Sequence, residues 1–497
     1  MTYISKIFSV SVGALYVLAA TDHTRNAYSL AHTSEEYISR AVEQLKETGL
    51  KSNNVWNRLA EMTDLYGARP PGSKNLEDSI DWIIRTIEKE DKNLIVTTQN
   101  VKIDVWHRQE ESLKLFTPTR GIVELDVKGL GRSVSTDGNG LTADVVVVSS
   151  FNELEEVKDT VKGKVVLFNN PFISYGESVG YRVNGAVNAE KYGAIAVLVR
   201  SVTPYSLNTV HVGASTRANI PAASITVEDA NLLGRMYNRS ISEEAQYADK
   251  INFPCPRVNL RLHNTYTPKS KVSRNIIVDV KGREKPDEIV LISGHIDSWD
   301  VGVGALDDGG GAFTGWEALR LISQLPTPPR RTVRVVFWVN EEYGATGART
   351  YFEKYKNQVG KHVFAMESDL GNYKPWGILV QDNGKAQHVL SKIGAKYLSS
   401  FTAGNVVNGK SGADVDILSR AGVPCVGFVT SDGRASFTAG DAFKDKYFNH
   451  HHTAGDRMEA LDASDLPANA ATMAIWAYVI AEMKGTLPRT PVKTLAQ

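Results

Sequence analysis

A histidine and a pair of aspartates stand on either side of a glycine-rich stretch of this chain. The stretch GHIDSWDVGVGALDDGGG, residues 294–311, contains His295, Asp297 and the neighbouring acids Asp307 and Asp308. Imidazole nitrogens and carboxylate oxygens are common ligands of divalent metals such as zinc. The glycines allow the chain to turn back, so that the acids can approach the histidine. A simpler interpretation stays open for the acids alone, because an aspartate pair at a helix start is usually a cap.

Three later clusters contain further residues of ligand type. Glu341 and Glu342 follow the apolar run TVRVVFWVN, Asp369 follows VFAMES, and His452 lies in FNHHHTAGD. A site with two zinc ions needs about three protein ligands for each metal and a carboxylate that bridges them. The candidate ligands for such a site are His295, Asp307, Glu342, Asp369 and His452. The sequence therefore predicts two Zn²⁺ ions bound by two imidazoles and three carboxylates.

The two adjacent glutamates are expected to have different roles. Neighbouring side chains at a strand end point in different directions, so one can bind metal while the other takes a proton from water. Taken alone, each cluster is weak evidence, since paired glutamates often begin a solvated helix and three histidines can lie in a surface loop. Together, five positions of ligand type, four of them after predicted strands, favour a metal site.

The elements that must position these residues alternate along the chain after Lys271. Apolar runs typical of buried strands are separated by helical patterns, as in residues 288–293, 309–325 and 332–339. Such alternation predicts an α/β fold with a mainly parallel sheet flanked by helices. Functional residues of these sheets lie at the carboxyl ends of the strands, where most of the clusters above are found.

The chain divides into five predicted segments. They are a signal peptide at 1–20, a pro-segment or N-terminal arm at 21–50, a first part of the main domain at 51–119, an inserted domain at 120–262 and the catalytic part at 263–490. The inserted segment has its own apolar strands and glycine turns but no ligand cluster. A chain of this length is expected to form more than one domain.

Composition excludes some classes of function and compartment. Lys and Arg together number 56, as do Asp and Glu, so nothing indicates a nucleic-acid partner. The apolar N-terminus predicts export to the extracellular space or the lysosome, with no membrane span in the mature protein. Cys255 and Cys425 are too few for a disulfide framework, and Cys425 is expected to be a buried thiol. Asn238 begins the sequon Asn-Arg-Ser and is a candidate for glycosylation.

The motifs resemble those of the co-catalytic zinc exopeptidases, in particular the carboxypeptidase Q-like branch, over roughly residues 54–488. The segments that carry the resemblance are GSKNLE, YRVNGAVNAEKYGA, IPAASITVEDA, GHIDSWDVGVGALDDGGGAF, NEEYG, MESDLG, AGVP and HHTAGD. The resemblance implies a zinc exopeptidase fold, an inserted block like a protease-associated domain, and a homodimer. It also implies that unblocked dipeptides or short peptides are the substrates.

Roles for single residues follow from the same resemblance. His295 and Asp369 would bind one zinc ion, Glu342 and His452 the other, with Asp307 as the bridge. Glu341 would be the general base, Asp297 would orient the His295 ring, and the Asp307–Asp308 peptide would be cis. His452 is preferred to His451 because the family motif places three residues between the histidine and an aspartate, here Asp456. Arg457 departs from the threonine that is usual after that aspartate.

Some assignments stay open at this stage. Asp414 and His211 are candidates for binding a substrate terminus, although a loop cap and a surface residue explain them equally well. A zinc amidase or cyclase that acts on non-peptide amides is the alternative enzyme, and a non-catalytic receptor-like homologue is the alternative from another class.

Overall fold

The computed structural model describes residues 35–242, 254–381, 384–431 and 446–489. The predicted signal peptide at 1–20 lies outside these residues. Within the segment 21–50, residues 35–49 form a helix, as the sequence pattern predicts. Leu45 of this helix is 1% exposed and belongs to the largest hydrophobic core. The helix is therefore packed as part of the main body.

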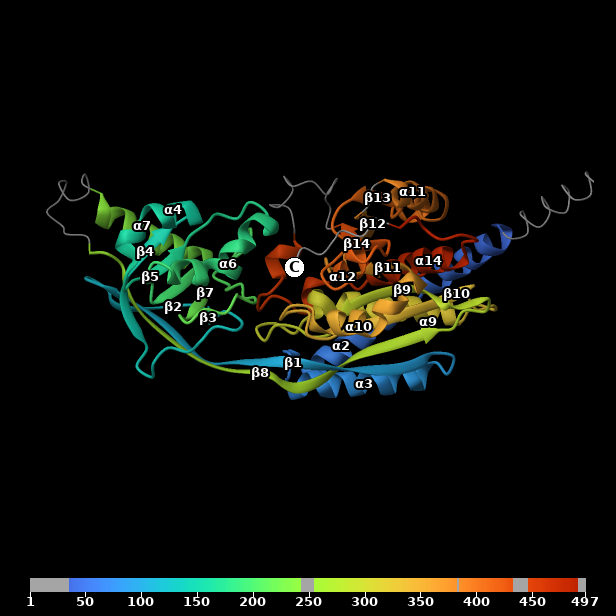
Figure 1. The fold of residues 1–497 in the computed structure, drawn as a ribbon, viewed down its shortest axis with the longest axis horizontal. Coiled ribbons are helices and arrows are strands. Elements are labelled where there is room, and N and C mark those ends of the chain that lie inside the picture. Colours follow the sequence, from blue (N-terminus) through green and yellow to red (C-terminus); the bar gives the residue numbers. More distant parts are fainter. Residues whose placement is uncertain (1–34, 243–253, 382–383, 432–445, 490–497) are drawn as a thin grey trace, which may run out of the picture.

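Figure 1 shows two lobes joined by two long strands. The main lobe comprises residues 35–90 and 285–489, and the inserted lobe comprises residues 121–241. The joining strands are β1 (Ile95–Thr117) and β8 (Arg257–Val280). They pair antiparallel from Ile95 opposite Asp279 to Phe116 opposite Arg257, with register shifts at Ile103/Val105 and Arg108/Glu111.

The centre of the main lobe is a parallel sheet, as predicted. Its strands lie in the order β14 (Cys425–Ser431), β11 (His362–Glu367), β9 (Lys285–His295) and β10 (Arg331–Trp338). Beyond β14, β12 (Lys374–Val380) pairs antiparallel with it and β13 (Asn405–Asn408) pairs parallel with β12. At the other edge β8 is antiparallel to β10.

Helices cover both faces of this sheet. Alternate residues of β9 point to opposite faces: Val290 and Ile292 join one core, whereas Ile289 and Leu291 join another. The first face is covered by α2 (Asn54–Tyr66), α3 (Lys74–Glu90), α9 (Gly310–Ser323) and α14 (Leu466–Glu482). The second face is covered by α10 (Thr346–Tyr355) and α12 (Asp416–Arg420). The remaining elements are η1 (Ala305–Gly309), η2 (Lys356–Lys361), α11 (Lys385–Tyr397), η3 (Ser399–Phe401), α13 (Tyr447–His450) and η5 (Met458–Ala460).

The inserted lobe contains both strands and helices. Its parallel strands β4 (Leu141–Val148), β5 (Val165–Phe168), β6 (Ala196–Arg200) and β7 (Ala222–Ile225) continue the sheet of the main lobe beyond β8. It also has β2 (Gly121–Leu125), β3 (Val127–Gly129), α4 (Phe151–Glu156), α5 (Lys158–Val161), α6 (Tyr175–Glu190) and α7 (Val227–Ile241). The resemblance to a protease-associated domain implies a β-rich block here, and the lobe has both strands and helices. Of the expected domain boundaries, 119/120 lies in the turn between β1 and β2, whereas 262/263 lies inside β8.

Side-chain caps fix the starts of several helices. Ser73, directly after the Pro-Pro-Gly turn, accepts a hydrogen bond from the Leu76 amide at 3.1 Å and begins α3. Thr226 accepts from the Asp229 amide at 3.0 Å and begins α7. Both cysteines are free thiols, with Cys425 buried as expected. Among the described residues, no helix has both the length and the apolar character needed to cross a membrane.

Candidate metal centre

The turn between His295 and Asp307 is held by close backbone packing. His295 is the last residue of β9, and Asp307 lies in η1 directly before α9. The glycines have a steric reason in two places. A Cβ atom on Gly294 would lie 2.5 Å from Asp308 Oδ2, and one on Gly311 would lie 2.1 Å from the Ser368 carbonyl oxygen. The Asp307–Asp308 peptide bond is cis, as the resemblance implies.

The Asp307 carboxylate lies between the two predicted histidine ligands. Its Oδ1 atom is 3.3 Å from His295 Nε2, and its Oδ2 atom is 3.3 Å from His452 Nε2. Beyond these, His295 Nε2 is 3.5 Å from Asp369 Oδ1, and His452 Nε2 is 3.1 Å from Glu342 Oε2. The five predicted ligands therefore form one continuous group, with each end of the group containing one imidazole and one further carboxylate.

This donor set fits zinc. The ligand atoms of His295, Asp307 and Glu342 all lie within 4.8 Å of one another, and the three residues are buried. Glu342 Oε1 is buried and accepts no hydrogen bond from any described residue. Buried carboxylates normally have hydrogen-bond donors or cations as partners. Imidazole nitrogens and carboxylate oxygens without thiolates are ligands that suit Zn²⁺.

Asp297 supports the site through both its carbonyl oxygen and its carboxylate. The His295 ring nitrogen Nδ1 lies 2.9 Å from the Asp297 backbone carbonyl oxygen, whereas the Asp297 carboxylate is 4.0 Å away. That carboxylate instead accepts hydrogen bonds from the Glu341 and Glu342 amides at 3.2 and 3.3 Å. Asp297 thus connects the first cluster to the two glutamates, and its carbonyl oxygen fixes the ring.

Asp308 and Asp456 hold the backbone around Asp307. Asp308 Oδ2 accepts a hydrogen bond from the His295 amide at 3.0 Å. Asp456 Oδ1 accepts from the Leu306 amide at 2.7 Å. Burial raises the pKa of Asp456 to about 7, and the nearby Asp307 carboxylate adds to the effect. The exposed Arg457 side chain donates to the Ala454 carbonyl oxygen at 3.0 Å, so this departure from the family does not reach the ligands.

Glu341 is surrounded by other acids. Burial raises its pKa well above the usual range, and the Asp369 and Asp297 carboxylates add to the effect while His295 opposes it. Cations placed among these acids would favour their ionised forms. Glu341, Glu342 and Asp307 all line one hollow of about 360 Å³ between the lobes. Glu341 is therefore placed at the wall of the space that a substrate would enter.

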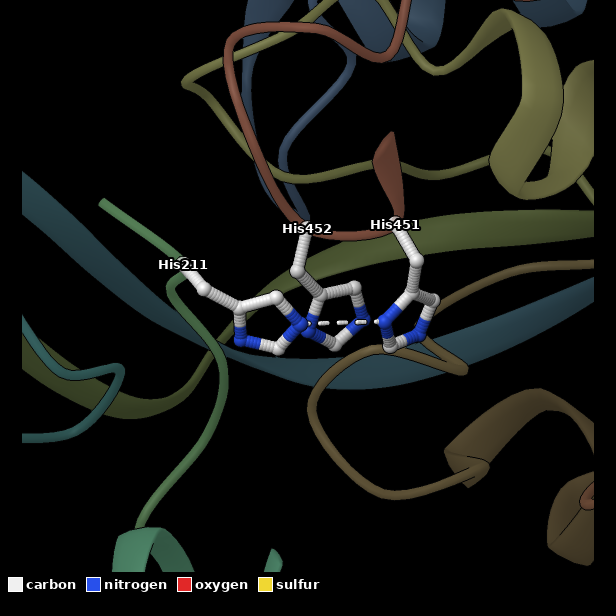
Figure 2. A group of neighbouring side chains, drawn as sticks. All are labelled: His211, His451 and His452. Atoms are coloured by element: carbon white, nitrogen blue, oxygen red, sulfur yellow. Dashed lines mark hydrogen bonds between the residues drawn. The ribbon is translucent and has the colours of Figure 1, made fainter. Parts of the chain in front are cut away.

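Figure 2 shows three neighbouring histidines, of which two belong to the main lobe and one to the inserted lobe. The His451 and His452 rings stack with 3.7 Å between centroids. Only His452 contacts two of the predicted carboxylates, since His451 Nε2 is 3.5 Å from Asp307 Oδ2 alone. His452 Nδ1 faces the Val212 carbonyl oxygen at 3.1 Å, which fixes its ring. This geometry favours His452 over His451 as the ligand.

His211 is not the surface residue that one interpretation expected. It is completely buried, and its Nε2 atom lies 3.2 Å from His451 Nδ1. The three histidines have the spacing of a metal group. No carboxylate belongs to that group, however, and Arg182 Nη1 lies 3.4 Å from His452 Nδ1. The positive charge of this guanidinium disfavours a cation there.

Asp414, the other open candidate, is buried behind the cleft. It is 1% exposed, and neither carboxylate oxygen has a hydrogen-bond partner among the described residues. Its neighbour Glu367 accepts hydrogen bonds from the Ala413, Asp414 and Val415 amides. Burial raises the pKa of Glu367 to about 7, with a further contribution from Asp369. Sequence reasoning gave Glu367 no role, although it lies two residues before a predicted ligand.

Two arginines near the site were also missed. Arg69, in the turn before α3, is fully buried and donates to the carbonyl oxygens of Ile296 and Gly304 at 2.7 and 2.8 Å. Arg182, on α6 of the inserted lobe, lines the same hollow as Glu341. Neither lies near a predicted ligand in the sequence, and the one local signal was that Arg182 stands in the segment YRVNGAVNAEKYGA, which carries the resemblance.

Comparison with known proteins agrees with this geometry. Residues 275–477 match the profile described as Peptidase family M28. The chain is 36% identical to carboxypeptidase Q of Rattus norvegicus over 492 residues, which cover 97% of both chains. The chain belongs to peptidase family M28. Carboxypeptidase Q of Homo sapiens is also 36% identical, with 91% of this chain and 90% of the human protein covered.

Solved structures of the M28 family share the fold. A peptidase M28 precursor from Shewanella amazonensis SB2B superimposes with a TM-score of 0.80 at 28% identity, covering 92% of this chain and all of that one. A zinc aminopeptidase from Bacillus subtilis gives a TM-score of 0.63 at 19% identity and covers 86% of this chain and 94% of that one. Family membership confirms two predictions from the sequence, the α/β fold class and the class of zinc-dependent exopeptidase.

Proposed function

We propose that this M28 peptidase uses two zinc ions to hydrolyse unblocked dipeptides and short peptides, releasing a terminal amino acid. The single observation that carries the proposal is the position of the Asp307 carboxylate, with one oxygen 3.3 Å from each predicted histidine ligand. His295 and Asp369 would hold one ion with Asp307, and His452 and Glu342 would hold the other. A carboxylate between two imidazoles is the arrangement that a pair of bridged metals requires.

Glu341 is the proposed general base. Bound zinc supplies Lewis-acid chemistry here, because it polarises a carbonyl oxygen and lowers the pKa of a neighbouring water molecule. Glu341 lines the hollow beside Glu342, takes a proton from the attacking water and returns it to the leaving amine. Asp297 holds the backbone amides of both glutamates, so the base and the ligand keep their relative positions.

The proposed site of action is an exported compartment, either the extracellular space or the lysosome. The apolar segment 1–20 supports this part of the proposal, and Asn238 is exposed in the last turn of α7, where a glycan could be attached. A homodimer is proposed from the resemblance of the sequence. Secretion from a eukaryotic host, intact-mass measurement with and without glycosidase, and light scattering would examine the three statements separately.

The alternative functions are not favoured. A receptor-like homologue would be expected to lose a ligand or the base, whereas all six positions contain suitable groups here. A zinc amidase or cyclase would act on N-acyl amino acids or other non-peptide amides. The relatives named carboxypeptidase Q instead support peptides as substrates.

The decisive experiment compares a library of free dipeptides with matching N-acyl amino acids. The zinc-loaded enzyme is expected to cleave the dipeptides, to lose activity with a chelator, and to recover it when zinc is added. Metal analysis of the same preparation is expected to give two ions per chain. Hydrolysis of N-acyl amino acids alone, or full activity with one ion, would refute the proposal.

A further inference from the structure

Two arginines of the inserted lobe line the hollow that contains the metal ligands. Arg182 lies on α6, and Arg132 follows β3. Arg182 is 6% exposed, and the Nε atoms of both side chains are buried without a hydrogen-bond partner. Within the described ranges, neither guanidinium has a carboxylate within 4.0 Å. Arg132 is partly buried and interacts with the Asp104 carboxylate, whereas Arg182 is the buried cation of the pair. A buried cation without a counter-ion is unfavourable, so an anion is expected beside Arg182 when the site is in use.

The backbone holds both guanidinium groups at the wall. Arg182 Nη1 donates to the Val212 carbonyl oxygen at 3.1 Å. The next residue, Gly213, provides the space, because a Cβ atom there would lie 2.2 Å from Arg182 Cζ. Arg132 has a left-handed backbone with a φ of 71° and donates to the Tyr343 carbonyl oxygen. Each side chain thus has a fixed direction and keeps further N–H donors for a ligand.

The opposite side of the cleft is acidic. Asp369 and Ala413 line both this hollow and a second one of about 830 Å³, which Lys410 and Arg420 also line, with Arg420 paired to Asp416. Tyr175 of α6 lines both hollows as well. The hollow that contains the predicted ligands therefore has cations at the wall of the inserted lobe and carboxylates at the wall of the main lobe. An unblocked dipeptide has the same polarity, with a carboxylate at one end and an ammonium group at the other.

Distances along a peptide agree with the position of Arg182. The α-carboxylate of a C-terminal residue lies within about 4 Å of the bond that releases this residue, because consecutive Cα atoms are about 3.8 Å apart. A group that binds the carboxylate must therefore lie beside the metal ligands. Arg182 Nη1 is 3.4 Å from the ring of His452, and Arg132 lies against the backbone of Tyr343, next to Glu342.

We propose that Arg182 and Arg132 bind the free α-carboxylate of the C-terminal residue of the substrate, with its N-terminus directed to the acidic wall. This inference rests on the proposed exopeptidase function and assigns the terminus that is recognised. An internal residue of a longer peptide has an uncharged amide in place of this carboxylate, so it would not pair with the two arginines. The inserted lobe would thereby favour cleavage of the last peptide bond.

The test measures kcat/KM for a cleaved dipeptide and for the same dipeptide as its C-terminal amide. Wild type is expected to prefer the free acid, and Arg182→Met or Arg132→Met is expected to reduce the preference by about 10- to 100-fold, as for loss of a charge-assisted hydrogen bond. Arg182→Lys should restore part of it. Arg217→Met is the matched control, because Arg217 is exposed in the same lobe and packs on the Tyr266 ring at 4.3 Å. Zinc content is measured for every variant.

The ratio of kcat/KM for the acid to kcat/KM for the amide distinguishes two roles of Arg182, which are binding the substrate carboxylate and positioning the His452 ring. If Arg182 only positions that ring, its variants lose the same factor with both substrates, and this result overturns the inference. An equal kcat/KM of wild type for acid and amide overturns it as well. If the zinc-loaded wild type cleaves neither compound, the proposed function fails. Calorimetric binding of the dipeptide acid and amide to zinc-loaded Glu341→Gln then decides the carboxylate site by itself, and equal affinities contradict it.

Discussion

Replacement of Arg69 by lysine tests how the turn between His295 and Asp307 is held. Arg69 donates to four carbonyl oxygens, those of Ile296, Gly67, Val303 and Gly304, at 2.7, 3.1, 2.5 and 2.8 Å. Two of these carbonyls flank the metal-binding turn on its return towards Asp307. Burial lowers the pKa of Arg69 to about 10, so the side chain is still charged at neutral pH. The turn between His295 and Asp307 is therefore stabilised by one buried guanidinium group, that of Arg69.

The expected magnitude follows from the number of lost donors. A lysine ammonium group reaches about two of the four carbonyls from one point, because it lacks the fork of a guanidinium. Two buried carbonyls without a partner cost about 1–3 kcal/mol each, so the turn should be destabilised by about 2–6 kcal/mol. His295 and Asp307 would then be held less firmly, and zinc affinity should fall in parallel.

Hydrogen–deuterium exchange of peptides that cover residues 296–306 is the suitable assay, because local opening is measured without an assumption of two-state unfolding. Zinc affinity is measured by competition with a chelator. Arg85→Lys, at an exposed position of α3, is the control and should change neither quantity. The reasoning is refuted if Arg69→Lys leaves exchange of the turn within about 1 kcal/mol of wild type and leaves zinc affinity unchanged.

Four further predictions concern the base, the ligand choice, pH and the N-terminal helix. Glu341→Gln should retain both zinc ions and reduce kcat by about 10²- to 10⁴-fold, since a positioned general base contributes that factor; near-normal turnover of a zinc-loaded preparation would disprove the role. His452→Ala should lose about one zinc ion per chain while His451→Ala retains both, because only His452 contacts two of the predicted carboxylates; equal zinc contents would contradict the choice. Burial lowers the pKa of His362 to about 4, so below a pH of about 6.5 the unfolded chain binds a proton that the folded chain does not. The free energy of unfolding should therefore fall by about 2 kcal/mol between pH 7 and pH 5. The Tm difference between these pH values should shrink in His362→Gln, and an unchanged difference would rule the contribution out. Leu45→Asp should lower Tm clearly, because this side chain is 1% exposed in the main core, and an unchanged Tm would mean that the helix at 35–49 is dispensable.

The sequence was most informative where apolar runs end in chemically active residues. Strands that are buried on both faces give nearly continuous apolar runs, so β9, β10 and β11 could be predicted, together with the candidate ligands that follow them. The atoms by which a residue supports its neighbours in the site were harder to predict. The sequence could not show which atom of Asp297 would face the His295 ring: the carbonyl oxygen is 2.9 Å from it, and the carboxylate accepts from the Glu341 amide at the next strand end.

Residues whose roles depend on distant contacts could not be predicted. Arg69 contacts a turn more than 220 positions away, and Arg182 approaches His452 across 270 positions. No local periodicity contains such information. The pairing of β1 with β8 could not be predicted for the same reason, since it joins residues from 184 positions apart (Ile95 and Asp279) to 141 positions apart (Phe116 and Arg257). The domain boundaries were predicted from the changing pattern of apolar residues, and they stay predictions. One of them, at 262/263, lies within the continuous strand β8.

The ladder of β1 and β8 determines how the two lobes can move relative to each other. Because both strands run without interruption from one lobe into the other, the connection is a twisted two-stranded ribbon and contains no flexible linker. Flexure of this ribbon would be greatest at its register shifts, Ile103/Val105 and Arg108/Glu111, where the ladder is interrupted. Such a joint holds the arginines of one lobe in a defined position opposite the predicted ligands of the other.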